Sequence, residues 1–143
     1  EAANFYVSLF KNSRILTVLR YPENSPGGEA DTVMTVSFEL DGQEYLALNG
    51  GPEFDFTEAI SLIVYCEDQE EVDRMWAGLT AGGEEVQCGW LKDKYGISWQ
   101  VVPRVLDDMM NSSDREKVDR VNQAMLKMVK LDIAELKRAF DGK

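Results

Sequence analysis

The pattern of apolar and polar positions predicts short strands and amphipathic helices. Within residues 1–11, Ala2, Phe5 and Leu9 recur at the spacing of one helix face. Further on, apolar and polar residues alternate, and Asp41-Gly42 between two alternating runs is a strong hairpin signal. The strands predicted in this half are residues 14–20, 32–40 and 44–49, with a loop at 21–31.

The next stretch predicts a strand, a helix and two more strands. Gly50-Gly51-Pro52 breaks the chain, and an apolar run at 59–66 follows. Asp68 with Glu71 forms a capping box, which predicts a helix start. The core face of that helix would carry Val72, Met75, Trp76 and Leu79, and strands are predicted at 84–91 and 95–102. One strand added before Glu1 would give two similar βαβββ-like units.

Residues 104–143 predict a helical tail. Two more capping boxes are expected, Ser113 with Glu116 and Asp132 with Glu135. Four of the six methionines lie in this tail, and their adaptable side chains suit packing against another surface. We expect the tail to pack either on its own domain or on a partner subunit.

The charge is distributed unevenly. The 143 residues carry a net charge of −11, which argues against nucleic-acid partners. Residues 1–103 hold 18 acidic and 6 basic residues, a balance of −12, whereas residues 104–143 hold 8 acidic and 9 basic, a balance of +1. The tail could therefore dock on an acidic body.

The cysteine count and the hydropathy of the chain indicate its cellular compartment. Cys66 and Cys88 are too few for a zinc site and lack the spacing of a redox pair, so we expect two free thiols. No apolar run approaches the length of about 20 residues that crosses a bilayer, and no signal-peptide pattern opens the chain. We expect a cytoplasmic protein.

Several segments resemble one known family. They are Leu46 to Pro52, Cys66 to Asp73, Cys88 to Pro103 and the opening Glu1 to Ser13. Together they are similar to the PhnB-like branch of the glyoxalase/bleomycin-resistance (vicinal oxygen chelate) superfamily. Members of this branch often carry the label 3-demethylubiquinone-9 3-methyltransferase. The resemblance implies an α+β fold of paired βαβββ units, in which a curved mixed sheet forms a cleft over residues 1–103. It also implies that the first strand of this domain precedes residue 1 and that residues 104–143 form the helical tail.

The same resemblance raises the question of a metal. Members of the superfamily hold a divalent metal through His, Gln and Glu side chains, and the chain has no histidine. By analogy, the ligand positions would fall near Ala47 or Asn49, near Ser61 and near Gln100. Neutral oxygens bind a divalent ion weakly without charged partners, so we expect no metal and no cofactor.

Strand alternation then nominates binding residues. On each strand we expect one apolar face under helices, including Leu46 and Leu48 on the hairpin, and one small or polar face lining the cleft. Trp99 is assigned to the core by this alternation. Such a face is either solvated or a small-molecule site, and the resemblance favours the site. The predicted ligand-binding residues are Asn49, Ser61 and Gln100 as polar contacts, with Tyr45, Phe54 and Trp90 as apolar walls.

Four functions stay open. The first is metal-independent binding of a small molecule, with or without a reaction. The second is a metal-dependent lyase, isomerase or dioxygenase completed by a ligand upstream of residue 1, and the third is a purely structural or interaction role. The fourth, a methyltransferase, lacks the glycine-rich strand-to-helix turn expected for its cofactor. No catalytic residue is nominated, and the resemblance and the tail together imply a homodimer.

Overall fold

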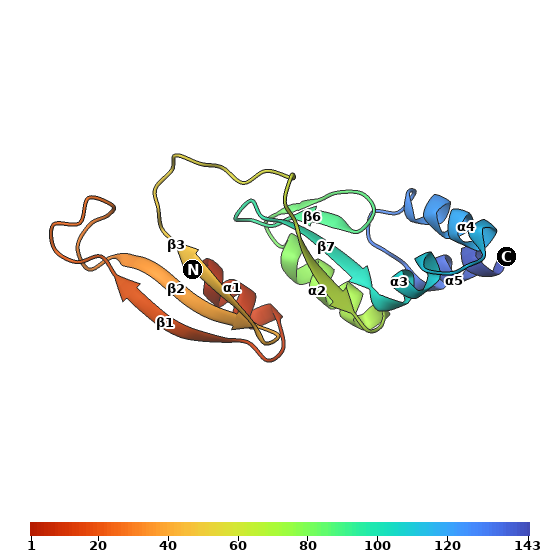
Figure 1. Cartoon of the computed structure of the whole chain (residues 1–143), viewed down its shortest axis with the longest axis horizontal. Helices are drawn as coiled ribbons and strands as arrows, with labels where there is room; N and C mark the ends of the chain where they lie inside the picture. Colours follow the sequence, from red (N-terminus) through yellow and green to blue (C-terminus); the bar gives the residue numbers. More distant parts are fainter. The chain divides into compact units, whose positions relative to one another are not determined.

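The β-strands form two separate sheets, one in each of two compact units (Figure 1). The computed structural model describes residues 1–143. Unit 1 spans Glu1–Asp55 and unit 2 spans Phe56–Lys143. The α+β fold class is confirmed. None of the helices combines the length and the apolar character required to span a membrane.

Unit 1 is a three-stranded antiparallel sheet with a helix on one face. Its elements are α1 (Ala2–Leu9), β1 (Arg14–Arg20), β2 (Val33–Leu40) and β3 (Gln43–Leu48), and the strand order is β1-β2-β3. Tyr6 of α1 stacks on Phe38 of β2 with ring centroids 6.3 Å apart, and Phe38 stacks on Tyr45 of β3 at 5.7 Å. These rings form the core between α1 and the sheet.

Unit 2 contains a complete βαβββ arrangement. Its elements are β4 (Leu62–Cys66), α2 (Gln69–Thr80), β5 (Glu84–Glu85), β6 (Trp90–Lys92) and β7 (Ser98–Pro103), and the strand order is β4-β7-β6-β5. β4 pairs with β7 in parallel, whereas the other pairs are antiparallel. Because a parallel pair needs a crossover, α2 and the strands after it lie between β4 and β7 in the sequence.

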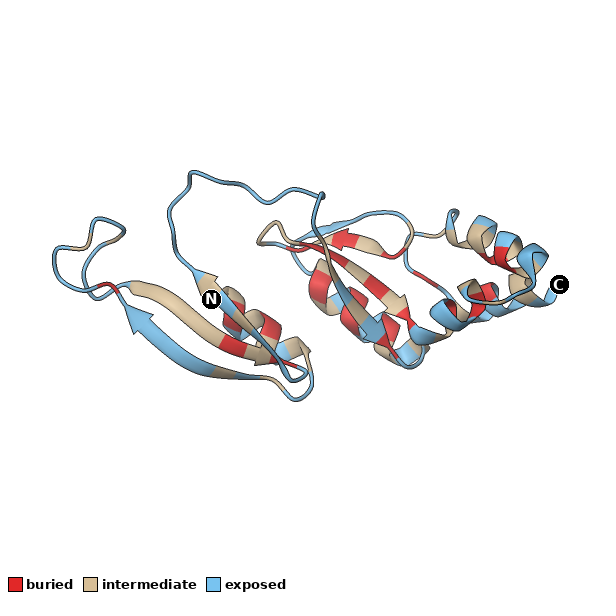
Figure 2. Ribbon diagram, viewed as in Figure 1, coloured by how far each residue is buried: buried red, intermediate tan, exposed pale blue.

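Helix α2 covers one face of this sheet. Asp68 caps the helix by accepting a hydrogen bond from the Glu71 backbone N–H at 2.9 Å, as its capping box predicts. The predicted core face is confirmed, since Val72, Met75, Trp76 and Leu79 are all buried (Figure 2). Trp99 is also buried, at 2% exposure, as the alternation predicts.

The strand predicted at 84–91 is wrong in its middle. Cys88 and Gly89 both have positive φ angles, 60° and 82°, which an extended strand does not accommodate. Their backbone N–H groups donate to the Met128 and Val129 carbonyls of the tail, each at 2.8 Å. The tail therefore replaces a sheet neighbour here, and the strand divides into β5 and β6. The strand predicted to begin at residue 59 begins at Leu62.

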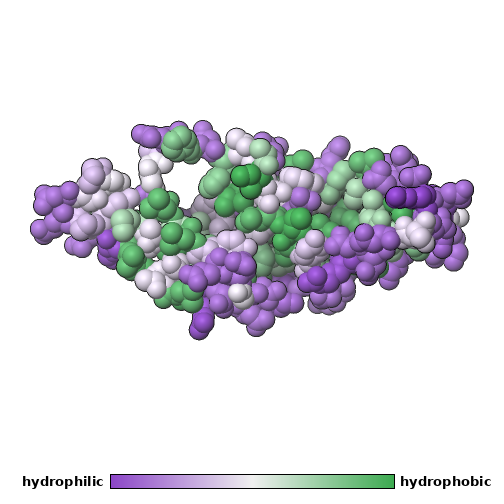
Figure 3. Space-filling view, in the orientation of Figure 1, coloured by the Kyte–Doolittle hydropathy of each residue, from purple (hydrophilic) through white to green (hydrophobic).

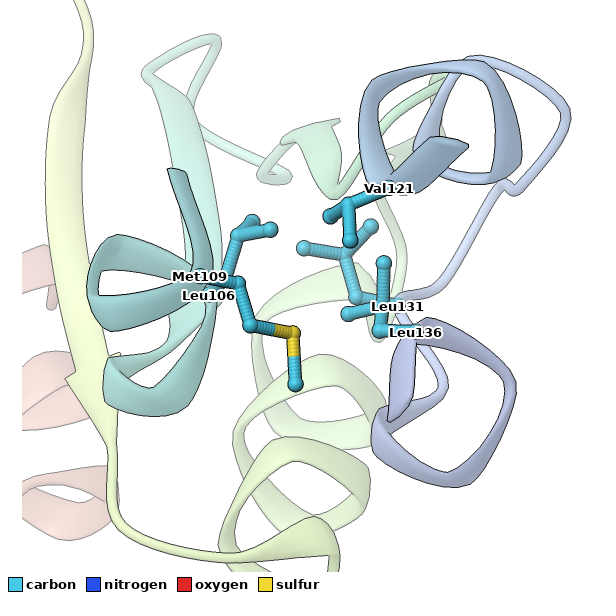
Figure 4. Close-up of a cluster of buried hydrophobic side chains, with 5 residues drawn as sticks. All are labelled: Leu106, Met109, Val121, Leu131 and Leu136. Atoms are coloured by element: carbon cyan, nitrogen blue, oxygen red, sulfur yellow. The ribbon is translucent and has the colours of Figure 1, made fainter. Parts of the chain in front are cut away.

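The tail folds into α3 (Arg104–Met110), α4 (Arg115–Met125) and α5 (Ile133–Asp141). Five of its buried side chains form one cluster, Leu106, Met109, Val121, Leu131 and Leu136 (Figure 4). The predicted cap at Asp132 is confirmed, because its side chain accepts from the Glu135 N–H at 2.8 Å. The cap predicted at Ser113 is wrong by one residue, since Asp114 accepts from the Lys117 N–H instead.

Polar contacts hold the tail on the rest of unit 2. The side-chain amide of Gln69 donates to the Leu131 carbonyl at 3.1 Å and accepts from the Ile133 N–H at 2.8 Å. Lys130 pairs with Asp73 at 2.5 Å, and this hydrogen bond lowers the pKa of the Asp73 carboxyl. These contacts thus join α2 to residues of the tail that lie far from it in the sequence.

A buried carboxylate organises the turn between β6 and β7. Asp93 is 3% exposed, and one of its oxygens accepts from the Tyr95 and Ile97 backbone N–H groups at 2.8 and 3.1 Å. Its other oxygen accepts from the Trp99 indole N–H at 2.8 Å. Gly96, at φ 88°, supplies the left-handed residue that the turn requires. One side chain therefore fixes both the turn and the core tryptophan.

We predict that Asp93→Ala lowers the free energy of unfolding of unit 2 by about 2–4 kcal/mol, because several donors lose their acceptor in a buried site. Asp93→Asn should cost less, since its carbonyl can still accept from the two backbone N–H groups. Urea denaturation measures both, with the exposed Asp119→Ala as a control that changes little. Equal stability of Asp93→Ala and the native protein would contradict this assignment.

Candidate functional site

The candidate site is the face of the unit 2 sheet that points away from α2, here called the open face. The strand register pairs Leu62 with Trp99 and Val64 with Val101, and Trp99 and Val101 are buried. Residues between these positions point to the opposite side, because successive side chains of a strand alternate. The open face carries Ile63 and Tyr65 of β4, Gln100 of β7 and Trp90 of β6.

Three of the predicted site residues meet on the open face. The Gln100 side-chain amide donates to the Ser61 hydroxyl at 2.9 Å, although 39 residues separate the two. Trp90 is the direct antiparallel partner of Gln100, so their side chains are neighbours on one face. All three are half-buried. The parallel pairing of β4 with β7 brings Ser61 to this place.

Apolar side chains surround this polar pair. Ile63 is 47% exposed and Tyr65 is 39% exposed on β4, whereas alternate residues of the same strand pack toward α2. Figure 3 shows hydrophobic side chains at the surface over the part of unit 2 where Figure 1 places β4. Small-molecule sites combine apolar side chains with a few fixed hydrogen-bonding groups, and the open face supplies both.

The cations beside the open face are paired with carboxylates. Lys92 of β6 contacts Glu58 at 2.5 Å. Hydrogen bonding to Lys92 lowers the pKa of the Glu58 carboxyl, and the same contact raises the pKa of Lys92. Arg104 pairs with Glu67 at 2.7 Å, which raises the pKa of the guanidinium. The charges of these side chains beside the open face are therefore balanced in pairs.

The other three predicted site residues belong to unit 1. Tyr45 stacks on Phe38 on the α1 side of its sheet. Asn49 donates from its side chain to the Val33 carbonyl at 2.9 Å and lines a cavity of about 230 Å³ beneath α1. Phe54 is 91% exposed.

The predicted faces of β3, the second strand of the hairpin, are wrong. Leu46 and Leu48 pair with Ser37 and Thr35, and they are 65% and 62% exposed. Ala47 instead pairs with Val36, and both line the cavity beneath α1. Alternation correctly predicts that successive side chains of β3 point to opposite faces of the sheet. The register with β2 decides which of the two sets of side chains faces α1, and the composition of β3 alone does not reveal that register.

The described residues do not fit a divalent metal. The chain brings no group of three or more His, Cys, Asp or Glu side chains together in a metal-binding arrangement. At the positions implied by the resemblance, Ser61 and Gln100 are neutral and hydrogen bonded to each other. Hard divalent cations favour carboxylate oxygens, which this pair does not supply.

Sequence reasoning did not find Asp93, Glu58 or Lys92. An Asp followed three residues later by Gly is a turn signal, so Asp93 could be expected to begin a turn. Nothing in the sequence indicated its bond to Trp99 or the ion pair between Glu58 and Lys92, which lie 34 residues apart. Both contacts depend on tertiary structure.

Comparison with known families gives a match over most of the chain. A family described as 3-demethylubiquinone-9 3-methyltransferase matches residues 1–102. The chain belongs to this family. It is PhnB-like, as the resemblance in its sequence implies.

Solved structures agree with this assignment. A putative 3-demethylubiquinone-9 3-methyltransferase, the PhnB protein from Bacillus cereus, is 40% identical, with a TM-score of 0.65 over 71% of this chain and 88% of that chain. A crystal structure of a Pseudomonas aeruginosa protein is 17% identical, with a TM-score of 0.59 over 71% of this chain and 86% of that chain, and it supports the fold alone. No curated protein matches the PhnB-like chain.

We predict that Glu58→Gln releases the segment before β4. Because the folded carboxyl has a lowered pKa, its pairing with Lys92 stabilises the fold above the ordinary value of 4.5 and is lost as the pH falls through the lowered value. The backbone order parameters of residues 56–61, measured by NMR relaxation, should therefore fall on acidification of the native protein, and should be low already at neutral pH in Glu58→Gln. The exposed Glu53→Gln is the control. Identical order parameters in Glu58→Gln and the native protein would show that the Glu58–Lys92 ion pair does not hold this segment.

Proposed function

We propose that this PhnB-like chain binds a small molecule on the open face of unit 2 without a metal. The observation that carries the proposal is the division of the sheet into two faces. Trp99 and Val101 are buried on the α2 side, whereas Ile63 and Tyr65 remain exposed on the other. Exposed apolar residues that gather around a fixed polar pair supply both kinds of group that a ligand contacts.

The polar pair supports a binding role over a merely solvated surface. Ser61 and Gln100 hold each other in place, so their remaining hydrogen-bonding groups are oriented before a ligand arrives. Preorganised groups lose less conformational entropy on binding. Trp90 adds a large flat side chain beside them, which suits stacking.

The turn between β4 and α2, where a nucleotide-like cofactor would bind, does not support the methyltransferase label of the family. The connection from β4 to α2 consists of Glu67 and Asp68, and it contains no glycine. Carboxylates at a helix start compete with an anionic or phosphate-like group for the backbone N–H groups. We therefore propose no methyl transfer for the site.

Homodimerisation stays a proposal. The apolar side of the tail packs within its own chain, through the cluster around Leu106 and Leu136, so the amphipathic pattern of the tail does not itself require a partner. In unit 1, Leu46 and Leu48 present apolar surface that a second copy could cover. A cytoplasmic location is likewise proposed, because both cysteines are free thiols.

We predict that thermal-shift screening of a metabolite library finds small molecules that raise the melting temperature of the protein. A ligand that binds only the folded state stabilises that state by mass action. Trp90→Ala should weaken such binding about three- to tenfold, the range expected for a lost aromatic contact. Leu126→Ala, which removes an exposed apolar side chain from the tail, is the matched control. Ligands that bind Trp90→Ala and Leu126→Ala equally well would place binding elsewhere.

The alternative with a metal makes a different prediction. Metal analysis of the purified protein separates the two, since a stoichiometric divalent ion whose removal abolishes ligand binding would contradict the proposal. Retained binding after treatment with a chelator is the expected result.

A further inference from the structure

The hydrogen-bonding capacity of the Ser61–Gln100 pair restricts the chemistry of its ligand. A glutamine amide offers two N–H donors and one carbonyl acceptor, and a serine hydroxyl offers one donor and two lone pairs. The single bond of 2.9 Å between them uses one N–H of Gln100 and one lone pair of Ser61. One N–H and the carbonyl of Gln100, and the O–H and one lone pair of Ser61, are then left, so a donor and an acceptor lie next to each other.

This conclusion does not depend on which way the amide is turned. If the Ser61 hydroxyl donates to the Gln100 carbonyl instead, the pair still offers an N–H donor beside a hydroxyl lone pair. No side-chain nitrogen or oxygen is both buried and unpartnered, so the unused carbonyl of Gln100 reaches the surface. In both arrangements, one donor and one acceptor lie side by side.

The surroundings disfavour an anionic ligand. Lys92 is held by Glu58 and Arg104 by Glu67, so a carboxylate or phosphate would have to displace a protein carboxylate. A cationic ligand would find neutral groups at the centre of the site, because Ser61, Gln100 and Trp90 carry no charge. The site favours a neutral molecule.

Trp90 adds a requirement of shape. Its side chain neighbours Gln100 on the open face, and no other aromatic ring of the described chain stacks on it. A planar conjugated ligand could stack on the indole while its edge reaches the polar pair. Offset stacking and two hydrogen bonds would then act on one rigid molecule.

We infer that the ligand is an uncharged planar molecule with a lactam-type edge, in which an N–H and a C=O lie next to each other. This inference rests on the proposed function and specifies the ligand class of the same site. The lactam N–H meets the acceptor of the Ser61–Gln100 pair, and the lactam carbonyl meets its donor.

Three related probes test the inference on the native protein. 2-Quinolone has the planar shape and the lactam edge, N-methyl-2-quinolone lacks the donor, and quinoline-2-carboxylate carries a negative charge. Quenching of tryptophan fluorescence and isothermal titration measure their dissociation constants. We expect 2-quinolone to bind about three- to tenfold more tightly than the N-methyl compound, the factor that corresponds to one net hydrogen bond. The carboxylate should bind more weakly than 2-quinolone.

A pair of variants links the preference to the residues. Ser61→Ala with Gln100→Leu removes the donor and the acceptor while leaving Trp90, so both quinolones should bind the double variant equally. The Leu126→Ala control should keep the preference for the lactam. Equal binding of the two quinolones to the native protein would overturn the lactam inference and leave binding on the open face intact. If neither quinolone binds but a library compound binds the open face, the lactam inference is wrong and the proposed function stands. If no compound binds the open face, both the lactam inference and the proposed function are wrong.

Discussion

The parallel pairing of β4 with β7 is the constraint on which unit 2 depends. Its register places Leu62 and Val64 opposite Trp99 and Val101, so all four point toward α2. The same register brings Ser61, at the entrance to β4, within hydrogen-bonding distance of Gln100. A shift of one residue would exchange the two faces, exposing the core set and burying the polar pair. The packing of α2 and the chemistry of the open face are therefore two consequences of one pairing.

Several contacts prevent that shift. Asp93 fixes the turn that leads into β7 and binds the indole of Trp99, which lies under α2. Gln69 joins the start of α2 to the loop before α5, and the tail carbonyls of Met128 and Val129 accept from the chain between β5 and β6. The tail thus supports the strand that carries Trp90. Its contribution to the site is indirect, through the position of β6.

Much of the fold could be predicted from the sequence, since it follows from local signals. The helix cap at Asp68, the buried face of α2 and the hairpin at Asp41-Gly42 each depend on residues close together in the chain. Alternation also placed Ser61 and Gln100 on one face and Trp99 on the other. The positions of Leu46 and Leu48 were not predicted, because the face of β3 is set by its register with β2. Nor could the break at Cys88 be foreseen, because its hydrogen-bond partners lie 40 residues away in the tail.

The functional account rests on the open face as a preorganised, neutral surface of unit 2. Its most direct test is nuclear magnetic resonance of the native protein, in which the Gln100 side-chain amide and the Trp90 indole N–H are followed during titration with 2-quinolone. The account predicts that these two signals shift the most and saturate together. Saturating shifts confined to unit 1 or to the tail, with these two signals unmoved, would contradict it.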